Sequence, residues 1–264
     1  MDHKEVGRIW DSNAAAWTVL SRVGYDTYRD CLNTPAFLES LPDVKGLLGL
    51  DIGCGEGYNT RLLARNDARM TGVDVSGVFI RSAHESEQET PSSIDYLVAS
   101  AVELPFSDAH FDFATGFMSF MDIPETERVI AEAYRILKPG GFLQFSISHP
   151  CCDTPHRVNL RDENGLAYAL EVGDYFRNLE GDVAEWLFSA APDDAKRGLS
   201  PFKTPRFTRT ISQWLNLLID SGFTLERIEE PHPSDEVVKE CPNIQDAQVV
   251  AYFLHVRGRK PDAV

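Results

Sequence analysis

The chain has 264 residues, of which 43% are apolar and 25% are charged, a composition typical of one large globular domain. No apolar run approaches the roughly 20 residues that cross a bilayer, and the charged first ten residues lack the apolar core of a signal peptide. We therefore expect a cytoplasmic protein with no membrane partner. The formal net charge of −16 disfavours a nucleic-acid substrate, because polyanions bind basic surfaces.

The first half of the chain alternates between strands and helices after an N-terminal helical stretch over residues 1–45. Short apolar runs predict strands over residues 47–52, 70–75, 94–99, 111–117 and 142–147. The spacing of apolar residues predicts helices over residues 58–66, 77–89 and 125–137, the last ended by Lys138-Pro139-Gly140-Gly141.

The alternation stops over residues 149–207, which are rich in turn-forming, charged and aromatic residues. This stretch is too long for an ordinary connection. A helix over residues 211–221 and strands over 224–229 and 249–256 complete the pattern. The order predicts a single α/β domain with a doubly wound, mostly parallel sheet of seven strands. Ligands of such sheets bind beyond the carboxyl ends of the strands, so residues 149–207 are predicted to form a lid there.

The most informative segment is a glycine-rich turn that joins a buried strand to a helix. It reads Asp51-Ile52-Gly53-Cys54-Gly55-Glu56-Gly57. Glycine permits positive φ and a close approach of the backbone to a ligand, and the following helix start favours an anion. An NAD site needs a third glycine where this chain has Tyr58, which disfavours a dinucleotide.

This segment resembles the class I S-adenosylmethionine-dependent methyltransferases, and especially their methyltransferase type 11 branch. The resemblance is strong over residues 47–145 and loose at both ends. In that family the acid-x-Gly-x-Gly-x-Gly segment wraps the methionine part of the cofactor. The resemblance therefore implies contacts with S-adenosylmethionine from Asp51, Gly53, Cys54, Gly55 and Gly57.

Asp74 ends the second predicted strand, where the resemblance implies that an acid holds the ribose hydroxyls, with Val75 beside it. The alternative role for Asp74 is to cap the next helix, although Ser76 is better suited to that role. The third family segment reads Gly-Asp-Ala, and here Ser100 occupies the position of the aspartate. We expect the adenine at Ser100, Ala101 and Val102, mainly through the backbone of the last two.

Other candidate site residues follow from position. Phe117 and Met118, at the end of the fourth strand, match cofactor-facing positions of the family, and Trp10 is either part of a cap over the cofactor or a core residue. His149 follows the fifth strand, and its ordinary pKa suits a general base; the alternative is a histidine that fixes the strand end. Asp122 and Asp153 are weaker candidates, since loop acids more often interact with solvent or cap turns.

Five cysteines occur at irregular spacings, and we predict that all are reduced thiols: Cys31, Cys54, Cys151, Cys152 and Cys241. None of the spacings is typical of a zinc site, so no metal is expected. The adjacent Cys151 and Cys152 raise the alternative of a soft metalloid site completed by Cys241. Adjacent side chains point in different directions, which disfavours such a site.

The resemblance implies methyl transfer from S-adenosylmethionine, which leaves S-adenosylhomocysteine, with positioning and desolvation as the main catalytic contributions. The aromatic residues of the predicted lid favour a small-molecule acceptor. The domain then divides into a helical cap (1–45), a cofactor-binding core (46–148), a lid or substrate segment (149–207) and the C-terminal part of the sheet (208–264). Two alternatives are a non-catalytic or regulatory cofactor-binding protein and a tRNA-modifying methyltransferase. The acceptor atom and the oligomeric state have no sequence signature.

Overall fold

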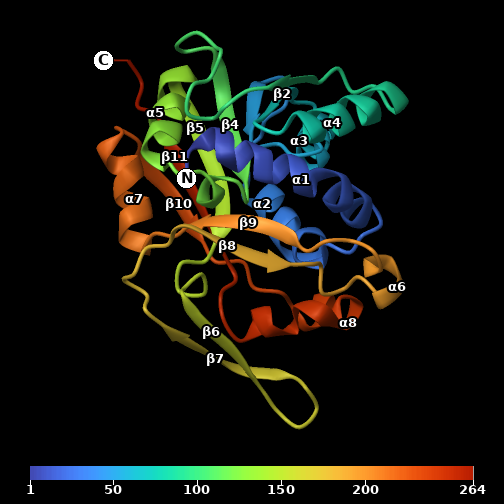
Figure 1. Ribbon diagram of the computed structural model, residues 1–264. Coiled ribbons are helices and arrows are strands. Elements are labelled where there is room, and N and C mark those ends of the chain that lie inside the picture. Colours follow the sequence, from blue (N-terminus) through green and yellow to red (C-terminus); the bar gives the residue numbers. More distant parts are fainter. Residues whose placement is uncertain (264) are drawn as a thin grey trace.

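The computed structural model describes residues 1–263 and has a seven-stranded sheet with helices on both faces (Figure 1). The order across the sheet is β10-β11-β5-β4-β1-β2-β3. The strands are β1 (Leu48–Ile52), β2 (Arg69–Asp74), β3 (Asp95–Val98), β4 (Phe111–Phe117), β5 (Leu137–Ser148), β10 (Thr224–Glu229) and β11 (Phe253–Arg259). Strands β1 to β5 pair in parallel, and β11 runs antiparallel between β5 and β10. The predicted doubly wound, mostly parallel sheet is confirmed.

Helices cover both faces of this sheet because each presents one apolar side to it. On one face lie α5 (Thr126–Ile136) and α7 (Ile211–Asp220), which bury Val129, Ile130, Trp214 and Leu218. On the other face lie α2 (Thr34–Ser40), α3 (Tyr58–Arg65) and α4 (Gly77–Glu89), which bury Phe37, Leu63, Ile80 and Ala83. Helix α1 (His3–Arg22) contacts α4 and a strand of the later segment, β9 (Phe202–Phe207). Within residues 1–263, no helix combines the length and hydropathy that crossing a bilayer requires.

Most predicted elements of the sheet occur with small shifts of their ends. Helix α4 and strands β4 and β10 have the predicted bounds. Strand β5 begins earlier than predicted, at Leu137, because the chain pairs with β4 on both sides of an irregularity at Gly140, whose φ is +76°. Strand β11 begins later, at Phe253, because residues 249–252 form the irregular turn that follows a 3-10 helix, η3 (Pro242–Gln248).

The segment predicted to be irregular, residues 149–207, contains two antiparallel hairpins. One pairs β6 (His156–Arg161) with β7 (Ala167–Gly173), and the other pairs β8 (Glu180–Trp186) with β9 (Phe202–Phe207). A short helix, α6 (Asp193–Lys196), lies in the loop between β8 and β9. Figure 1 shows both hairpins beyond the edge at which β5 ends. This edge is also where the carboxyl ends of the parallel strands meet.

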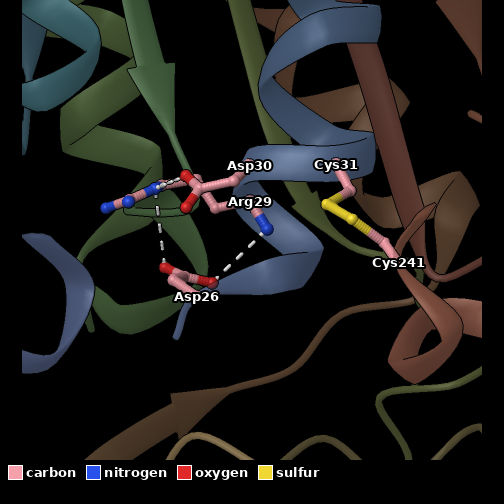
Figure 2. Close-up of a disulfide and its surroundings, with 5 residues drawn as sticks. All are labelled: Asp26, Arg29, Asp30, Cys31 and Cys241. Carbon is pink, nitrogen blue, oxygen red and sulfur yellow. Dashed lines mark hydrogen bonds and ion pairs between the residues drawn. A yellow bond between two sulfur atoms is a disulfide. The ribbon is translucent and has the colours of Figure 1, made fainter. Parts of the chain in front are cut away.

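A disulfide joins the N-terminal helical region to the C-terminal region (Figure 2). It links Cys31, in the π-helical turn η1 (Arg29–Asn33), to Cys241, between α8 (Asp235–Glu240) and η3. The prediction of reduced thiols is therefore wrong for these two residues, while Cys54, Cys151 and Cys152 are free. The pairing spans 210 residues of sequence, and Leu32 packs with Ile244 and Ala247 of the other segment in one buried cluster.

Candidate active site

A cavity of about 1150 Å³ opens at the carboxyl ends of β1, β2, β4 and β5. The glycine turn after β1 lines it, as do residues that directly follow β2 and β4. Its other walls come from α1, from residues 25–29 of the N-terminal region, from the two hairpins and from the segment around η3. The chain thus brings segments from its N-terminal, middle and C-terminal parts around the edge that the sequence predicts to bind a ligand.

The three glycines of the turn have different surroundings, although all have positive φ: +74° at Gly53, +55° at Gly55 and +83° at Gly57. A Cβ on Gly57 would lie 2.4 Å from the hydroxyl oxygen of Tyr96, and one on Gly53 would lie 2.4 Å from Cβ of Ser119. A Cβ on Gly55 would meet no atom within 4 Å. Gly53 and Gly55 line the cavity and Gly57 does not. The backbone of Gly55 is therefore open to close approach by a ligand.

Two aspartates, the buried Asp51 and the half-buried Asp74, support this turn, and both line the cavity. Asp51 accepts hydrogen bonds from the hydroxyls of Thr60, at 2.6 Å, and Thr115, at 3.1 Å. Asp74 accepts the backbone N–H of Gly55 at 2.9 Å and that of Ser76 at 2.8 Å. Burial raises the pKa of each carboxyl to about 6, against the effect of these donors.

The alternative role of Asp74 as a helix cap does not apply, because Ser76 is the N-cap of α4 and accepts the N–H of Phe79 at 3.2 Å. Each Asp74 oxygen keeps a lone pair beyond its one backbone donor. Since the carboxyl also lines the cavity, it is able to accept two further hydrogen bonds from a ligand.

Most of the remaining predicted cofactor residues also reach the cavity wall, namely Trp10, Cys54, Val75, Ser100, Ala101, Phe117 and Met118. Trp10 packs at the same time against Phe79 and Trp17, with ring centroids 6.1 and 5.5 Å apart. Val102 does not reach the wall, because it belongs to the buried core beneath α5. Val102 and Gly57 therefore do not reach the cavity to contact a ligand.

The structure does not bring His149 to the cavity. Side chains alternate between faces along an extended chain, and here Ser148 faces the cavity while His149 is buried, with 4% of its surface exposed. Its Nε2 lies 2.9 Å from Oε1 of Glu230, and its Nδ1 accepts the N–H of Cys151 at 3.2 Å. Both ring nitrogens are therefore occupied in holding the turn after β5.

Several polar residues that line the cavity belong to no sequence motif. Arg29 lies over the ring of Tyr58, 3.9 Å from its centroid, and pairs with Asp30 at 2.7 Å and Asp26 at 3.8 Å (Figure 2). Arg206 of β9 pairs with Asp153 through Nε at 3.0 Å. These residues come together only in the tertiary structure, so local sequence motifs do not identify them.

A second polar group centres on Asp246 of η3. Its carboxyl accepts hydrogen bonds from the hydroxyls of Tyr28 and Tyr252 and from the amide of Asn159. All four residues line the cavity. They come from the N-terminal region, from β6 and from the C-terminal region, so this network ties together three walls close to the disulfide.

Residues 50–145 match a family model described as a methyltransferase domain. An uncharacterized protein of Haemophilus influenzae is 28% identical over 216 residues, which cover 78% of this chain and 79% of that protein. The 27-O-demethylrifamycin SV methyltransferase of Amycolatopsis mediterranei is 35% identical over 97 residues, which cover 36% of each. This chain thus matches about a third of that enzyme's length.

Among solved structures, an S-adenosylmethionine-dependent methyltransferase of Mesorhizobium loti superposes with a TM-score of 0.68 at 27% identity. The match covers 85% of this chain and 96% of that one. The segment that matches the family model contains the glycine turn, Asp74 and Ser100. Residues 50–145 are therefore a class I S-adenosylmethionine-dependent methyltransferase domain of the methyltransferase type 11 branch, and the cofactor is S-adenosylmethionine.

Proposed function

We propose that the protein transfers the methyl group of S-adenosylmethionine to a small molecule bound in the same cavity. One observation carries this proposal: a single space runs from the glycine turn to an aromatic wall formed by Trp17 of α1 with Trp186 and Phe188 of the second hairpin. A cavity of about 1150 Å³ is large enough for two ligands side by side, since one ligand site typically measures about 300–1,000 Å³.

The cofactor end of the cavity has groups for each part of S-adenosylmethionine. Asp74 has free lone pairs for the ribose hydroxyls, and Ser100 and Ala101 lie where the adenine is expected. The open backbone at Gly55 suits the methionine part. Arg29, over the ring of Tyr58, also lines the cavity, and its guanidinium has N–H donors beyond the Nε that pairs with Asp26 and Asp30, so we expect it to bind the methionine carboxylate.

The rest of the cavity is suited to holding an acceptor and excluding water. When bound, the cofactor supplies a methyl group on a sulfonium, so the leaving group needs no protonation. The chain therefore has to align the nucleophile and keep water out, and these effects account for much of the catalysis. Trp17, Trp186 and Phe188 supply rigid apolar surface for an aromatic or alicyclic acceptor.

The charges at the cavity support a small molecule over a nucleic acid. Three of the four arginines that line it are paired with carboxylates: Arg29, Arg161 with Asp246, and Arg206 with Asp153. Phosphate backbones require unpaired basic side chains, and the net charge of −16 adds long-range repulsion. The Amycolatopsis relative, whose name describes a methylated small molecule, agrees with this choice.

The test begins with calorimetric titration of the purified protein with S-adenosylmethionine, S-adenosylhomocysteine and NAD. We expect micromolar affinity for the first two and no heat with NAD. A panel of small hydroxylated aromatic compounds is then incubated with methyl-labelled cofactor, and label transferred to an acceptor establishes the activity. Absence of binding by both cofactor forms would overturn the proposal. Binding without transfer to any compound, including a total tRNA control, would favour a regulatory role.

A further inference from the structure

Asp122 is a buried acid that faces the cavity without a partner. It ends the 3-10 turn η2 (Phe120–Asp122), directly after β4, and its surface is 6% exposed. It lines the cavity, yet across residues 1–263 its carboxyl makes no hydrogen bond and no ion pair, and only its backbone N–H is bonded, to the oxygen of Ser119 at 3.1 Å. An unpartnered carboxyl in such a place is unfavourable, which points to a role toward a bound ligand.

The turn η2 is held against the cofactor-binding glycine turn. Ser119, which precedes η2, donates its hydroxyl to the backbone oxygen of Ile52 at 2.7 Å. Its Cβ lies so close to Gly53 that a side chain there would not fit. Asp122 follows one 3-10 turn later, so it lies next to the part of the cavity where the methionine end of the cofactor is expected.

The charged groups around Asp122 come from two neighbouring segments. Asp153, after β5, and Arg206, of β9, pair with each other and face Asp122 together. On the chain beyond Asp122, Glu125 is engaged with His3 and Arg128. Burial raises the pKa of Asp122 well above its ordinary value, Asp153 raises it further, and Arg206 lowers it. The Asp153–Arg206 pair is close to neutral overall, so no fixed positive charge is left over for Asp122.

We propose that Asp122 accepts the proton from the acceptor during methyl transfer, and that the acceptor is a neutral molecule whose nucleophile is a hydroxyl group. This inference rests on the proposed function. In the reaction a bond forms between the hydroxyl oxygen and the methyl carbon. The methyl carbon–sulfur bond breaks with its electron pair remaining on sulfur, and the hydroxyl proton passes to the Asp122 carboxylate and then to water.

A hydroxyl is favoured over an ammonium group by the charge count at this point of the cavity. The ionised Asp122 balances the single positive charge of the sulfonium, and the Asp153–Arg206 pair adds none. A cationic acceptor would place a second positive charge beside the sulfonium, where Asp122 supplies a single negative charge. A neutral hydroxyl adds no charge and needs the base that Asp122 provides.

The test uses the two known cofactor forms and needs no acceptor. S-adenosylmethionine carries the sulfonium charge and S-adenosylhomocysteine lacks it, while the ribose and amino-acid parts that we expect to meet Asp74 and the glycine turn are the same in both. The ratio of their dissociation constants reports the charges near the sulfur, and the part of its pH dependence that Asp122→Asn removes belongs to Asp122, because Asp51 and Asp74 are unchanged in that variant. We expect the affinity for S-adenosylmethionine to rise about tenfold relative to that for S-adenosylhomocysteine as increasing pH ionises Asp122.

Three variants sharpen the measurement. Asp122→Asn should reduce the pH dependence of the ratio to the part that Asp51 and Asp74 contribute, and Asp122→Glu, which keeps the acid, should restore the full dependence. Asp153→Asn should move the dependence to lower pH, because it removes a like charge and frees Arg206. If both ligands bind to the wild type with a ratio that does not change with pH, or if Asp122→Asn keeps the wild-type profile, the inference is wrong. If neither ligand binds, the proposed function itself fails.

Two further measurements use the wild-type protein, so they test the inference even if the Asp122 variants do not fold. Calorimetry of the wild-type protein in buffers of different ionisation enthalpy counts released protons, and we expect more protons released with S-adenosylmethionine than with S-adenosylhomocysteine. Equal release would contradict the inference. Mass spectrometry of the product from the acceptor screen locates the new methyl group. Methylation on oxygen supports the assignment, and methylation on nitrogen, carbon or sulfur overturns it.

Discussion

The Asp74 carboxyl accepts the backbone N–H of Gly55 at 2.9 Å, so the acid at the end of β2 fixes the conformation of the turn that follows β1. The residue proposed to hold the ribose thus also shapes the segment proposed to hold the methionine part. The two halves of the cofactor site are therefore expected to respond together to a single change.

Replacement of Asp74 by alanine should weaken the binding of S-adenosylmethionine and of S-adenosylhomocysteine equally. The expected loss of binding free energy is about 1–3 kcal/mol, the scale of hydrogen bonds to a charged group. Calorimetric titration of both ligands measures the loss. Asp11→Ala serves as the control, since Asp11 accepts a hydrogen bond from Ser76 but does not line the cavity. An Asp74 variant with wild-type affinities would remove this residue from the ribose site.

Alanine at Gly55 and alanine at Gly57 should have different effects. Both positions have positive φ, which costs a non-glycine residue about 1–2 kcal/mol. At Gly57 the new Cβ also meets Tyr96, which should add about 1–3 kcal/mol of destabilisation. At Gly55 the Cβ enters open space and should mainly reduce cofactor affinity. Urea unfolding measures the stability of each variant, and ligand titration measures its cofactor affinity. Equal losses of stability in the two variants would show that Tyr96 moves aside.

Asp51 should make the stability of the protein depend on pH. Its pKa is raised from 3.8 to about 6 in the folded state, so its favourable contribution is complete below pH 3.8 and is lost as the pH rises through about 6. Relative to Asp51→Asn, the wild type should therefore lose about 1 kcal/mol of unfolding free energy between about pH 5 and about pH 7.5. Urea denaturation at both pH values measures this difference. A difference that grows in the opposite direction would mean that Thr60 and Thr115 outweigh burial.

His149→Ala should lower stability by about 1–3 kcal/mol, because it removes a buried ring and its bonds to Glu230 and Cys151. Cofactor affinity and turnover per folded molecule should stay near the wild-type values, since the ring lies outside the cavity wall. Thermal unfolding and turnover on a confirmed acceptor measure the two effects. Glu230→Gln, which alters the same contact from its more exposed side, is the control. A turnover loss in a stable His149 variant would restore the base role.

The parts of the fold that the sequence predicts are those with a repeating apolar pattern. Helix α5 was predictable because Val129, Ile130, Ala133 and Ile136 recur at helical spacing and are all fully buried. The hairpins were not, because strands such as β8 are exposed along most of their length. A strand with no buried face carries no alternation of apolar and polar residues.

The site divides in the same way. The glycine turn and Asp74 lie in a local motif, and so they were predictable from a few consecutive residues. Arg29 and Arg206 reach the cavity from separate segments, and only long-range folding places them there. His149 was predicted to face the cavity, but its neighbour Ser148 does so instead, because successive side chains of a strand point to opposite faces. Asp122 was ranked low because a loop acid in a sequence does not reveal that it is buried.

The disulfide also turns most of the chain into a covalent ring. Strands β1 to β10 lie within the 210 residues that it spans, and β11 lies outside. Phe176, which is 86% exposed between the two hairpins, is an open site for a chymotrypsin-like protease. A single cut there leaves two polypeptides that remain linked through Cys31 and Cys241. The nicked protein would keep its mass on a non-reducing gel and separate into two bands only after a reductant is added.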